Sequence, residues 1–258
     1  MKTIRMMTTV PGLVFAAVLF AAGLVLPANA ALIHHYTFNT NADDSVGTRD
    51  GTSTGNASIN NSVFAPVPGG SSGSLDLTSG GYVELPSVST SPLAVYSIAM
   101  WVRINSASTP GALYQNPDWS NSLHLIYETN YETNDKVFRA AVTDSPSFKD
   151  SSSAPALNTW IHLAVTVDDN VNELRMYLNG IEDGSASTTQ GGQRILDLIE
   201  VGDYATGGRQ FDGWIDDLRV YDSTLSGSEV MALIPEPNTM GLLLLMAASV
   251  VIRRLRNR

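Results

Sequence analysis

The chain has 258 residues and no cysteine, which excludes disulfides and zinc sites built on cysteine. Residues 31–234 carry 9 Lys and Arg against 24 Asp and Glu. This excess of negative charge argues against nucleic-acid binding, which depends on neutralising phosphates. It is compatible with binding calcium or neutral glycans, or with solubility alone.

The first 30 residues have the parts of a secretory signal. Lys2 and Arg5 form a basic start, Gly12–Leu26 is an apolar run, and Ala28-Asn29-Ala30 supplies a small-residue cleavage site. We expect residues 1–30 to be removed as a signal peptide. An uncleaved membrane anchor is the alternative.

A strand is expected at Leu32–Phe38, followed by a loop over residues 39–51 that is rich in Asn and Asp. The side chains of Asn39, Asp43 and Asp44 offer oxygen atoms at close spacing, and hard cations such as calcium bind oxygen ligands. Such residues also form ordinary turns. The loop alone therefore leaves both interpretations open.

Short segments with alternating apolar residues follow, separated by Gly, Asn, Asp and Ser. Asn179-Gly180 is typical of a type I′ hairpin turn, and Ser226 with Glu229 forms a capping box that predicts a short helix to about Leu233. With no βαβ rhythm, the pattern predicts an all-β, antiparallel two-sheet sandwich of jelly-roll type over residues 31–234. The expected later strands are Ser74–Leu77, Gly81–Leu85, Tyr96–Ile104, Ala112–Gln115, Ser122–Glu128, Lys136–Val142, Thr159–Val167, Glu173–Leu178, Ile181–Ser185, Ile195–Val201 and Phe211–Tyr221.

The last of these strands is interrupted by two adjacent acids, Asp216 and Asp217, where its alternation breaks. Neighbouring carboxylates repel unless each is solvated, hydrogen-bonded or bound to a cation. We expect one of the two to point inward or along the sheet edge and to need a partner.

Three aromatic residues in polar stretches, Trp119, Tyr131 and Tyr204, are candidate ligand-binding residues. Aromatic rings on a rim could stack on sugars, and their exposure distinguishes this role from that of core or loop-anchoring residues.

The C-terminus has three parts in order. Pro235-Glu236-Pro237 precedes the apolar run Thr239–Ile252, and four arginines lie in the last six residues. The run spans about 21 Å as a helix, short for a hydrocarbon core of about 30 Å, so we expect a transient anchor with its basic end in the cytoplasm. Residues 235–258 resemble the PEP-CTERM sorting tail. The resemblance implies an exosortase as partner and Pro235, Glu236 and Pro237 as its processing motif.

The motifs NTWIHLAVTVD, ELRMYLNG, IEVGD and FDGWIDDLRVYDSTLSGSEVMAL, with the earlier YTFNTNADDSVG, GGYVELP and YSIAMWVRI, resemble the laminin-G-like jelly-roll family of the concanavalin-like lectin/glucanase superfamily. The resemblance implies a structural calcium between the first loop and the acid pair. Its ligands would be Asp44 and Asp217, with Asn39 and Asp43 as weaker candidates.

The superfamily also contains glycoside hydrolases. A retaining hydrolase needs two carboxylates about 5 Å apart, commonly spaced as Glu-x-Asp-x-Glu or Glu-x-Asp-x-x-Glu on one strand, and neither spacing occurs here. We therefore expect no enzymatic activity.

The expected function is that of a secreted, exosortase-processed, carbohydrate-binding domain of the cell surface or exopolysaccharide matrix. The alternatives are a structural or adhesive matrix protein that binds other proteins, and a glycoside hydrolase.

Overall fold

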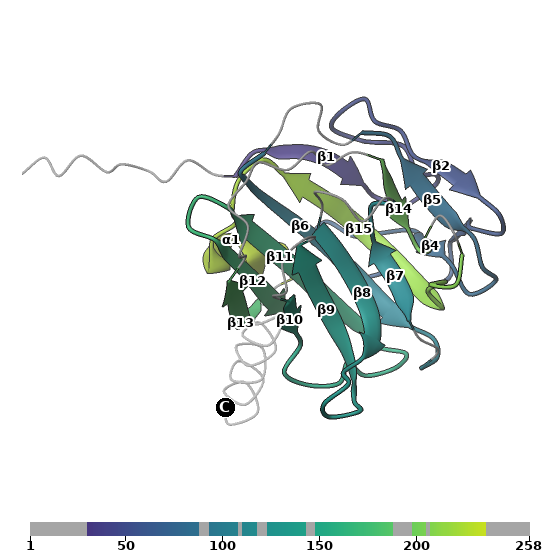
Figure 1. Cartoon of the computed structure of the whole chain (residues 1–258). Coiled ribbons are helices and arrows are strands. Elements are labelled where there is room, and N and C mark those ends of the chain that lie inside the picture. The colour runs from purple at the N-terminus through teal and green to yellow at the C-terminus, as the bar shows by residue number, and fades with distance from the viewer. Residues whose placement is uncertain are drawn as a thin grey trace, which may run out of the picture.

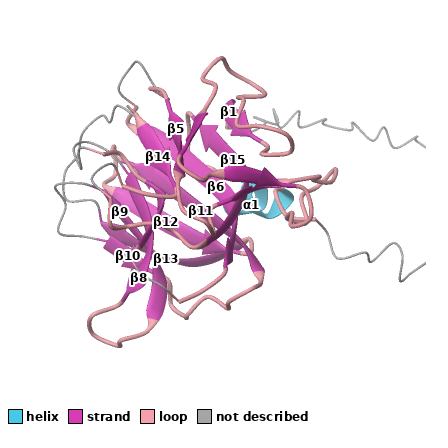
Figure 2. Ribbon diagram, turned by 90° about the vertical axis from the view of Figure 1, so that its right-hand side faces the viewer, coloured by secondary structure: helices cyan, strands magenta, loops and turns pink. Residues whose placement is uncertain are grey.

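The structure is a computed structural model that describes residues 30–87, 93–107, 110–117, 123–142, 148–187, 198–204 and 207–235. These residues form two antiparallel sheets packed face to face, with one short helix on the far side of one sheet (Figures 1 and 2). The predicted sandwich is therefore the observed architecture. Trp119, Glu236 and Pro237 lie outside the described residues.

The first sheet is the larger, and its hydrogen-bonded order is β13-β12-β11-β6-β15-β4-β3, with β1 also pairing with β15. Because β1 pairs with β15, the first and last strands of the domain lie side by side. Its strands are β1 (Leu32–Tyr36), β3 (Ser58–Asn60), β4 (Ser74–Asp76), β6 (Val95–Ile104), β11 (Trp160–Asp168), β12 (Glu173–Leu178), β13 (Ile181–Ser187) and β15 (Gly213–Tyr221).

The second sheet has two hydrogen-bonded parts, β10-β9-β8-β7 and β14-β5-β2. An antiparallel bridge between Gln115 and Glu200 joins them, so that β7 and β14 are neighbours. The strands are β2 (Thr52–Thr54), β5 (Tyr82–Leu85), β7 (Gly111–Tyr114), β8 (Leu123–Thr129), β9 (Lys136–Val142), β10 (Phe148–Asp150) and β14 (Ile199–Val201).

Alternating side chains from both sheets fill the space between them, as period-2 strands require. In β6, Ile98, Met100, Val102 and Ile104 belong to this core, which confirms the alternation expected for that strand. We call the side of each sheet that faces away from this core its outer face.

The outer face of the first sheet carries helix α1 (Gly227–Ala232) and a second, smaller apolar cluster that includes Tyr177, Tyr221 and Val230. Ser226 caps the helix, and the reciprocal bond from its N3 residue, Glu229, completes the predicted capping box. Figure 2 shows α1 on the opposite side of the first sheet from the second sheet. The described part of the chain contains no helix long and apolar enough to cross a membrane.

Three observed strands were not expected from the sequence: β2, β3 and β10. Each has three residues, and β2 and β3 consist largely of Ser, Thr and Asn, so that no apolar alternation marks them. All three lie at sheet edges, where pairing with a neighbouring strand rather than burial defines the element. The Asn179-Gly180 turn was predicted correctly, and both of its residues have positive φ.

Candidate functional site

The loop after β1 is organised by the Asp44 carboxylate. Its Oδ1 accepts backbone N–H bonds from His35, Val46 and Gly47, and its Oδ2 lies 2.6 Å from His34 Nδ1. Burial disfavours the charged carboxylate, but these hydrogen bonds outweigh burial and lower the pKa of Asp44 to about 2. A Cβ on Gly47 would come within 2.3 Å of Asp44 Oδ2, so the glycine is needed for this close approach.

Asp216 and Asp217 form a β-bulge in β15. The register with β6 shifts between Asp216 and Arg219, and Asp217 has φ 51°, in the left-handed region. Asp217 therefore departs from the strand's alternation and can lie on the same side as Asp216 and Arg219. The predicted break in the pattern at this pair is confirmed, and both acids are buried.

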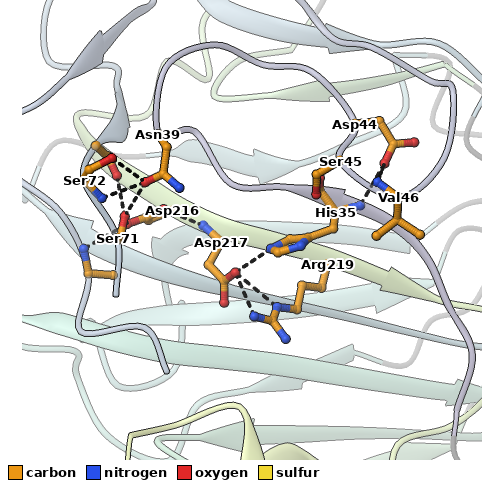
Figure 3. Close-up of polar contacts among 12 residues, drawn as sticks. His35, Asn39, Asp44, Ser45, Val46, Ser71, Ser72, Asp216, Asp217 and Arg219 are labelled. Atoms are coloured by element: carbon orange, nitrogen blue, oxygen red, sulfur yellow. Dashed lines mark hydrogen bonds and ion pairs between the residues drawn. The ribbon is translucent and has the colours of Figure 1, made fainter. Parts of the chain in front are cut away.

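Asp217 finds its partners on β1 and on its own strand. Its Oδ1 lies 2.6 Å from His35 Nε2 and accepts bonds from Arg219 Nε at 3.1 Å and Nη2 at 3.0 Å (Figure 3). Its Oδ2 is buried and has no hydrogen-bond partner among the described residues. Oδ1 of Asp217 thus has three polar contacts, whereas Oδ2 has none from the described residues. We call Oδ2 the open oxygen.

Asp216 is held differently. Its Oδ2 accepts bonds from Ala65 N and Ser71 Oγ, both at 2.9 Å, and its Oδ1 accepts one from Asp217 N at 2.7 Å. Burial is the largest influence, and with the neighbouring Asp217 charge it raises the pKa of Asp216 to about 7.

A pocket of about 90 Å³ lies beside these acids, and Asn39, Ser71, Asp216, Asp217 and Arg219 are among its lining residues. Of the four residues predicted to bind a metal, Asp217 and Asn39 share this pocket, but Asp44 and Asp43 do not line it.

Asp44 does not reach this pocket because neighbouring residues of β1 point to opposite sides of the strand. The His34 side chain contacts Asp44 on one side, and the His35 side chain contacts Asp217 on the other. Figure 3 shows Asp44 apart from the group around Asp217.

Oxygen atoms are the ligands that calcium prefers, and the pocket brings Oδ2 of Asp217 together with the oxygen-bearing side chains of Asn39, Ser71 and Asp216. Within the described ranges, no group of three or more His, Cys, Asp or Glu side chains is placed to hold a metal ion. Arg219 neutralises one of the two carboxylate charges. A cation bound here would therefore face at most a single uncompensated negative charge, and it would supply the partner that Oδ2 lacks.

A second candidate site lies on the outer face of the second sheet. Tyr131, in the turn between β8 and β9, is 84% exposed, and Phe148, the first residue of β10, is 48% exposed. The Arg139 guanidinium lies 5.9 Å from the centre of the Tyr131 ring and 3.8 Å from that of Phe148. We call Tyr131, Arg139 and Phe148 the aromatic platform.

Ion pairs hold the platform in place. Arg139 donates to both carboxylate oxygens of Asp150, at 2.6 and 2.8 Å, and pairs with Glu128 Oε1. The hydrogen bond to Asp150 is the main cause of a raised pKa for Arg139. Because a bidentate pair fixes the guanidinium plane, the two rings flank an immobilised cation.

The three aromatic residues predicted to bind a ligand have different outcomes. Tyr131 is the most exposed large hydrophobic or aromatic side chain among the described residues. Tyr204 is half-buried in the loop after β14, and Trp119 is not described. The sequence analysis did not identify Phe148 as a ligand-binding candidate. Phe148 is a single apolar residue followed by Lys149 and Asp150, so no alternating pattern marks it as part of a strand.

We predict that replacing Asp216 by Asn changes how stability depends on pH. With its pKa raised from 3.8 to about 7, Asp216 keeps in the folded chain a proton that the unfolded chain releases, so folding loses stability as the pH rises through that interval. The Asp216→Asn variant does not have this loss. We therefore expect the free energy of unfolding of the variant, minus that of the unmodified chain, to increase by up to about 4 kcal/mol between about pH 4 and about pH 7.

Urea unfolding of both proteins across this range is the measurement. The pKa of His162 is lowered to about 4 by burial and gives the opposite slope, but His162 is present in both proteins and cancels in the difference. A difference that is constant with pH would contradict the prediction.

Comparison with known proteins supports the architecture. Two solved structures share the fold: domain 4 of AbnA, a GH43 extracellular arabinanase from Geobacillus stearothermophilus, in complex with arabinotriose, and the ligand binding domain of botulinum neurotoxin serotype D in complex with N-acetylneuraminic acid. The first is 21% identical, with a TM-score of 0.63, and covers 81% of this chain and 100% of its own. The second is 15% identical, with a TM-score of 0.59, and covers 78% of this chain and 50% of its own.

A family model described as "Concanavalin A-like lectin/glucanases superfamily" matches residues 77–231, more than half of the chain. The matched segment begins just after β4, ends within α1 and includes the acid pair of β15. The chain therefore belongs to the concanavalin A-like lectin/glucanase superfamily.

Proposed function

We propose that this protein is a non-enzymatic carbohydrate-binding domain and that the outer face of its second sheet holds the glycan. The aromatic platform is the observation that carries the proposal. Exposed apolar groups rimmed by polar ones mark binding surfaces, and here two rings are exposed beside Arg139, Glu128 and Asp150.

The chemistry of the platform suits a sugar. A sugar ring presents an apolar C–H face and polar edges, so an aromatic ring can pack against the face while fixed charged groups take the hydroxyls. The ion pairs of Arg139 hold the acceptor oxygens of Glu128 and Asp150 in place before a ligand arrives, which reduces the entropy lost on binding.

The solved structures with the same fold support this choice of ligand class. One is a complex with arabinotriose and the other a complex with N-acetylneuraminic acid. At their low identity they establish a shared fold, and the glycan assigned to this chain is our inference from the platform.

The test is a glycan-binding screen of the purified protein, followed by calorimetry on the tightest ligand with two matched variants. Phe148→Ala removes a platform ring that is 48% exposed, whereas Phe64→Ala removes a ring that is 46% exposed and lies outside the platform. We expect Phe148→Ala and Tyr131→Ala to weaken binding about tenfold, a loss of about 1.4 kcal/mol, because each removes a ring that packs against the sugar. Phe64→Ala should bind as the unmodified protein does.

Equal losses in the Phe148 and Phe64 variants would contradict the assigned surface. Absence of binding to every glycan in the screen would exclude the function and favour the matrix-protein alternative. Cleavage of a bound oligosaccharide would contradict the non-enzymatic part of the proposal.

We also propose a structural calcium ion at the pocket of Asp217 and Asn39, without Asp44 or Asp43. Calcium should raise the thermal unfolding midpoint relative to chelator by several degrees, since a ligand at about 100 times its Kd contributes about 2.7 kcal/mol. Asp217→Asn should abolish the shift, and Asp43→Asn, at an exposed position, should retain it. Equal midpoints in calcium and in chelator would exclude the ion.

We further propose that the protein is exported and processed at both ends, on the basis of the signal-like residues 1–30 and the tail of residues 235–258. Mass spectrometry of the exported protein should find Ala31 as its first residue and the chain cut near Pro235-Glu236-Pro237. A strain without exosortase should retain the tail. Exported protein that keeps the tail in the presence of the exosortase would contradict the processing.

A further inference from the structure

A groove lies on the outer face of the first sheet, between strands β11 to β13 and the loop that leads into α1. Its volume is about 370 Å³, within the range of about 300–1,000 Å³ that is typical of ligand pockets. A second pocket of about 300 Å³ shares Glu173 with it and continues along β13. We call the first of these cavities the β12 groove. Its charged, polar and aromatic lining includes Thr166, Asp168, Glu173, Arg175, Tyr177 and Glu182.

Strand register gathers these side chains on one face. The residues that flank Thr166 of β11 and Arg175 of β12 belong to the core between the sheets, so both side chains face outward. Thr166 and Arg175 are direct cross-strand partners. Tyr177 also faces outward, packs in the smaller apolar cluster with Leu225, and is the partner of Glu182 on β13.

The opposite wall of the groove is the loop between β15 and α1. The buried Ser97 of β6 fixes this loop, because its Oγ donates to the carbonyl of Ser223 at 2.8 Å and accepts from the N–H of Leu225 at 2.9 Å. Thr224 and Ser226 are exposed at the rim. The groove is therefore bounded by fixed elements and open to solvent.

Arg175 presents its charge to the groove between two carboxylates. Its guanidinium lies 2.9 Å from Glu173 Oε1 and 3.2 Å from Glu182 Oε2. The three side chains are 35–42% exposed. A ligand in the groove can thus reach hydrogen-bond donors on the arginine and acceptors on both glutamates.

Thr166 gives an independent indication of a ligand. It is 3% exposed and lines the groove, and its hydroxyl makes no hydrogen bond within the described part of the chain. Buried polar groups are normally hydrogen-bonded, and a hydroxyl can both donate and accept. A polar ligand in the groove would supply the missing partner.

We propose that the β12 groove is a second glycan site, which binds a neutral sugar and makes the protein a cross-linker of glycan chains. This inference rests on the ligand class proposed above and adds a site to it. Sugar hydroxyls both donate and accept, which matches the mixture of donors and acceptors in the groove. The carboxylates of Asp168, Glu173 and Glu182 outnumber the single guanidinium, so the negative charge of the groove repels uronic and sialic acids.

The β12 groove and the aromatic platform face away from each other. The groove lies on the outer face of the first sheet, on the side that carries α1, and the platform lies on the outer face of the second (Figure 2). The core between the sheets separates them. A short oligosaccharide in one site therefore leaves the other free, and a protein with both sites can join two polysaccharide chains.

The first experiment is calorimetry of the full chain with neutral oligosaccharides, arabinotriose included, and with N-acetylneuraminic acid. We expect two molecules of a neutral oligosaccharide per chain and none of N-acetylneuraminic acid in the groove. Thr166→Val and Arg175→Ala should each weaken one of the two sites about tenfold, and Phe148→Ala the other. Thr52→Val, at an exposed position of β2 outside both sites, is the matched control and should bind normally.

Thermal unfolding without ligand separates binding from a structural role of Thr166. Thr166→Val keeps the branched shape and removes a hydroxyl that lacks a partner, so its unfolding midpoint should be equal to or higher than that of the unmodified protein. A lower midpoint together with unchanged binding would contradict the assigned role.

The second experiment tests cross-linking directly. The unmodified protein should raise the viscosity of a long neutral polysaccharide built from the sugar that binds best. Arg175→Ala and Phe148→Ala each disable one site, so neither variant should raise the viscosity. Two bound oligosaccharides per chain without a rise in viscosity would overturn the cross-linking.

The outcomes separate this inference from the proposed function. One ligand per chain, weakened by Phe148→Ala and unaffected by Thr166→Val and Arg175→Ala, would show that the groove is wrong and that the platform stands. Binding that survives Phe148→Ala and is lost in Arg175→Ala would support the groove and overturn the platform. If no member of the panel binds, both are wrong. Binding of N-acetylneuraminic acid in the groove as tight as that of neutral sugars would overturn the assigned ligand class.

Discussion

Neutralisation of the acid pair in β15 is the constraint on which the first sheet depends. β15 lies inside the sheet, pairs with β6 along one side and with β1 and β4 along the other, and contains two buried carboxylates. Arg219 comes from the same strand and His35 from β1. The contact between His35 and Oδ1 of Asp217 therefore also ties the beginning of the domain to its end.

Asp216 and Asp217 meet the cost of burial in different ways. Asp217 is paired with Arg219 and contacts His35. Asp216 is surrounded by N–H and O–H donors and has a pKa raised to about 7 by burial and its neighbour's charge. The bulge makes this division possible, since the left-handed backbone at Asp217 redirects its side chain toward His35 and Arg219. The open Oδ2 of Asp217 is the remaining polar atom that a cation would satisfy.

The two sheets differ in what their outer faces present. The first is covered by α1 and by the segment around Ala65, which donates its N–H to Asp216. The described part of the second carries exposed aromatic rings, fixed ion pairs and a row of outward polar groups. Along β8 the outward residues His124 and Ile126 are buried, so the exposed part of this face is the end that carries Tyr131 and Phe148. The proposed glycan site lies at that end.

Sequence patterns predicted the elements that local chemistry specifies. The alternation of β6, the Asn179-Gly180 turn, the Ser226 capping box and the break at Asp216-Asp217 all follow from neighbouring residues. The pairing of Glu84 with Glu200 does not, because the two lie on strands more than a hundred residues apart.

The separation of Asp44 from Asp217 was also beyond sequence reasoning. It depends on which sides of β1 are taken by His34 and His35, and on the register of β1 with β15. Tyr131 was recognisable as a polar-loop aromatic, but its position beside Arg139 and Phe148 requires the β8–β9–β10 pairing.

The central claim is that the outer face of the second sheet binds a glycan. The most direct measurement is a crystal structure of the protein with a neutral oligosaccharide identified by screening. The account predicts a sugar ring against Tyr131 or Phe148, and hydroxyl groups within hydrogen-bond distance of Arg139, Glu128 or Asp150. A sugar bound on the first sheet, around α1 or at the Asp217 pocket, with the outer face of the second sheet unchanged, would contradict it.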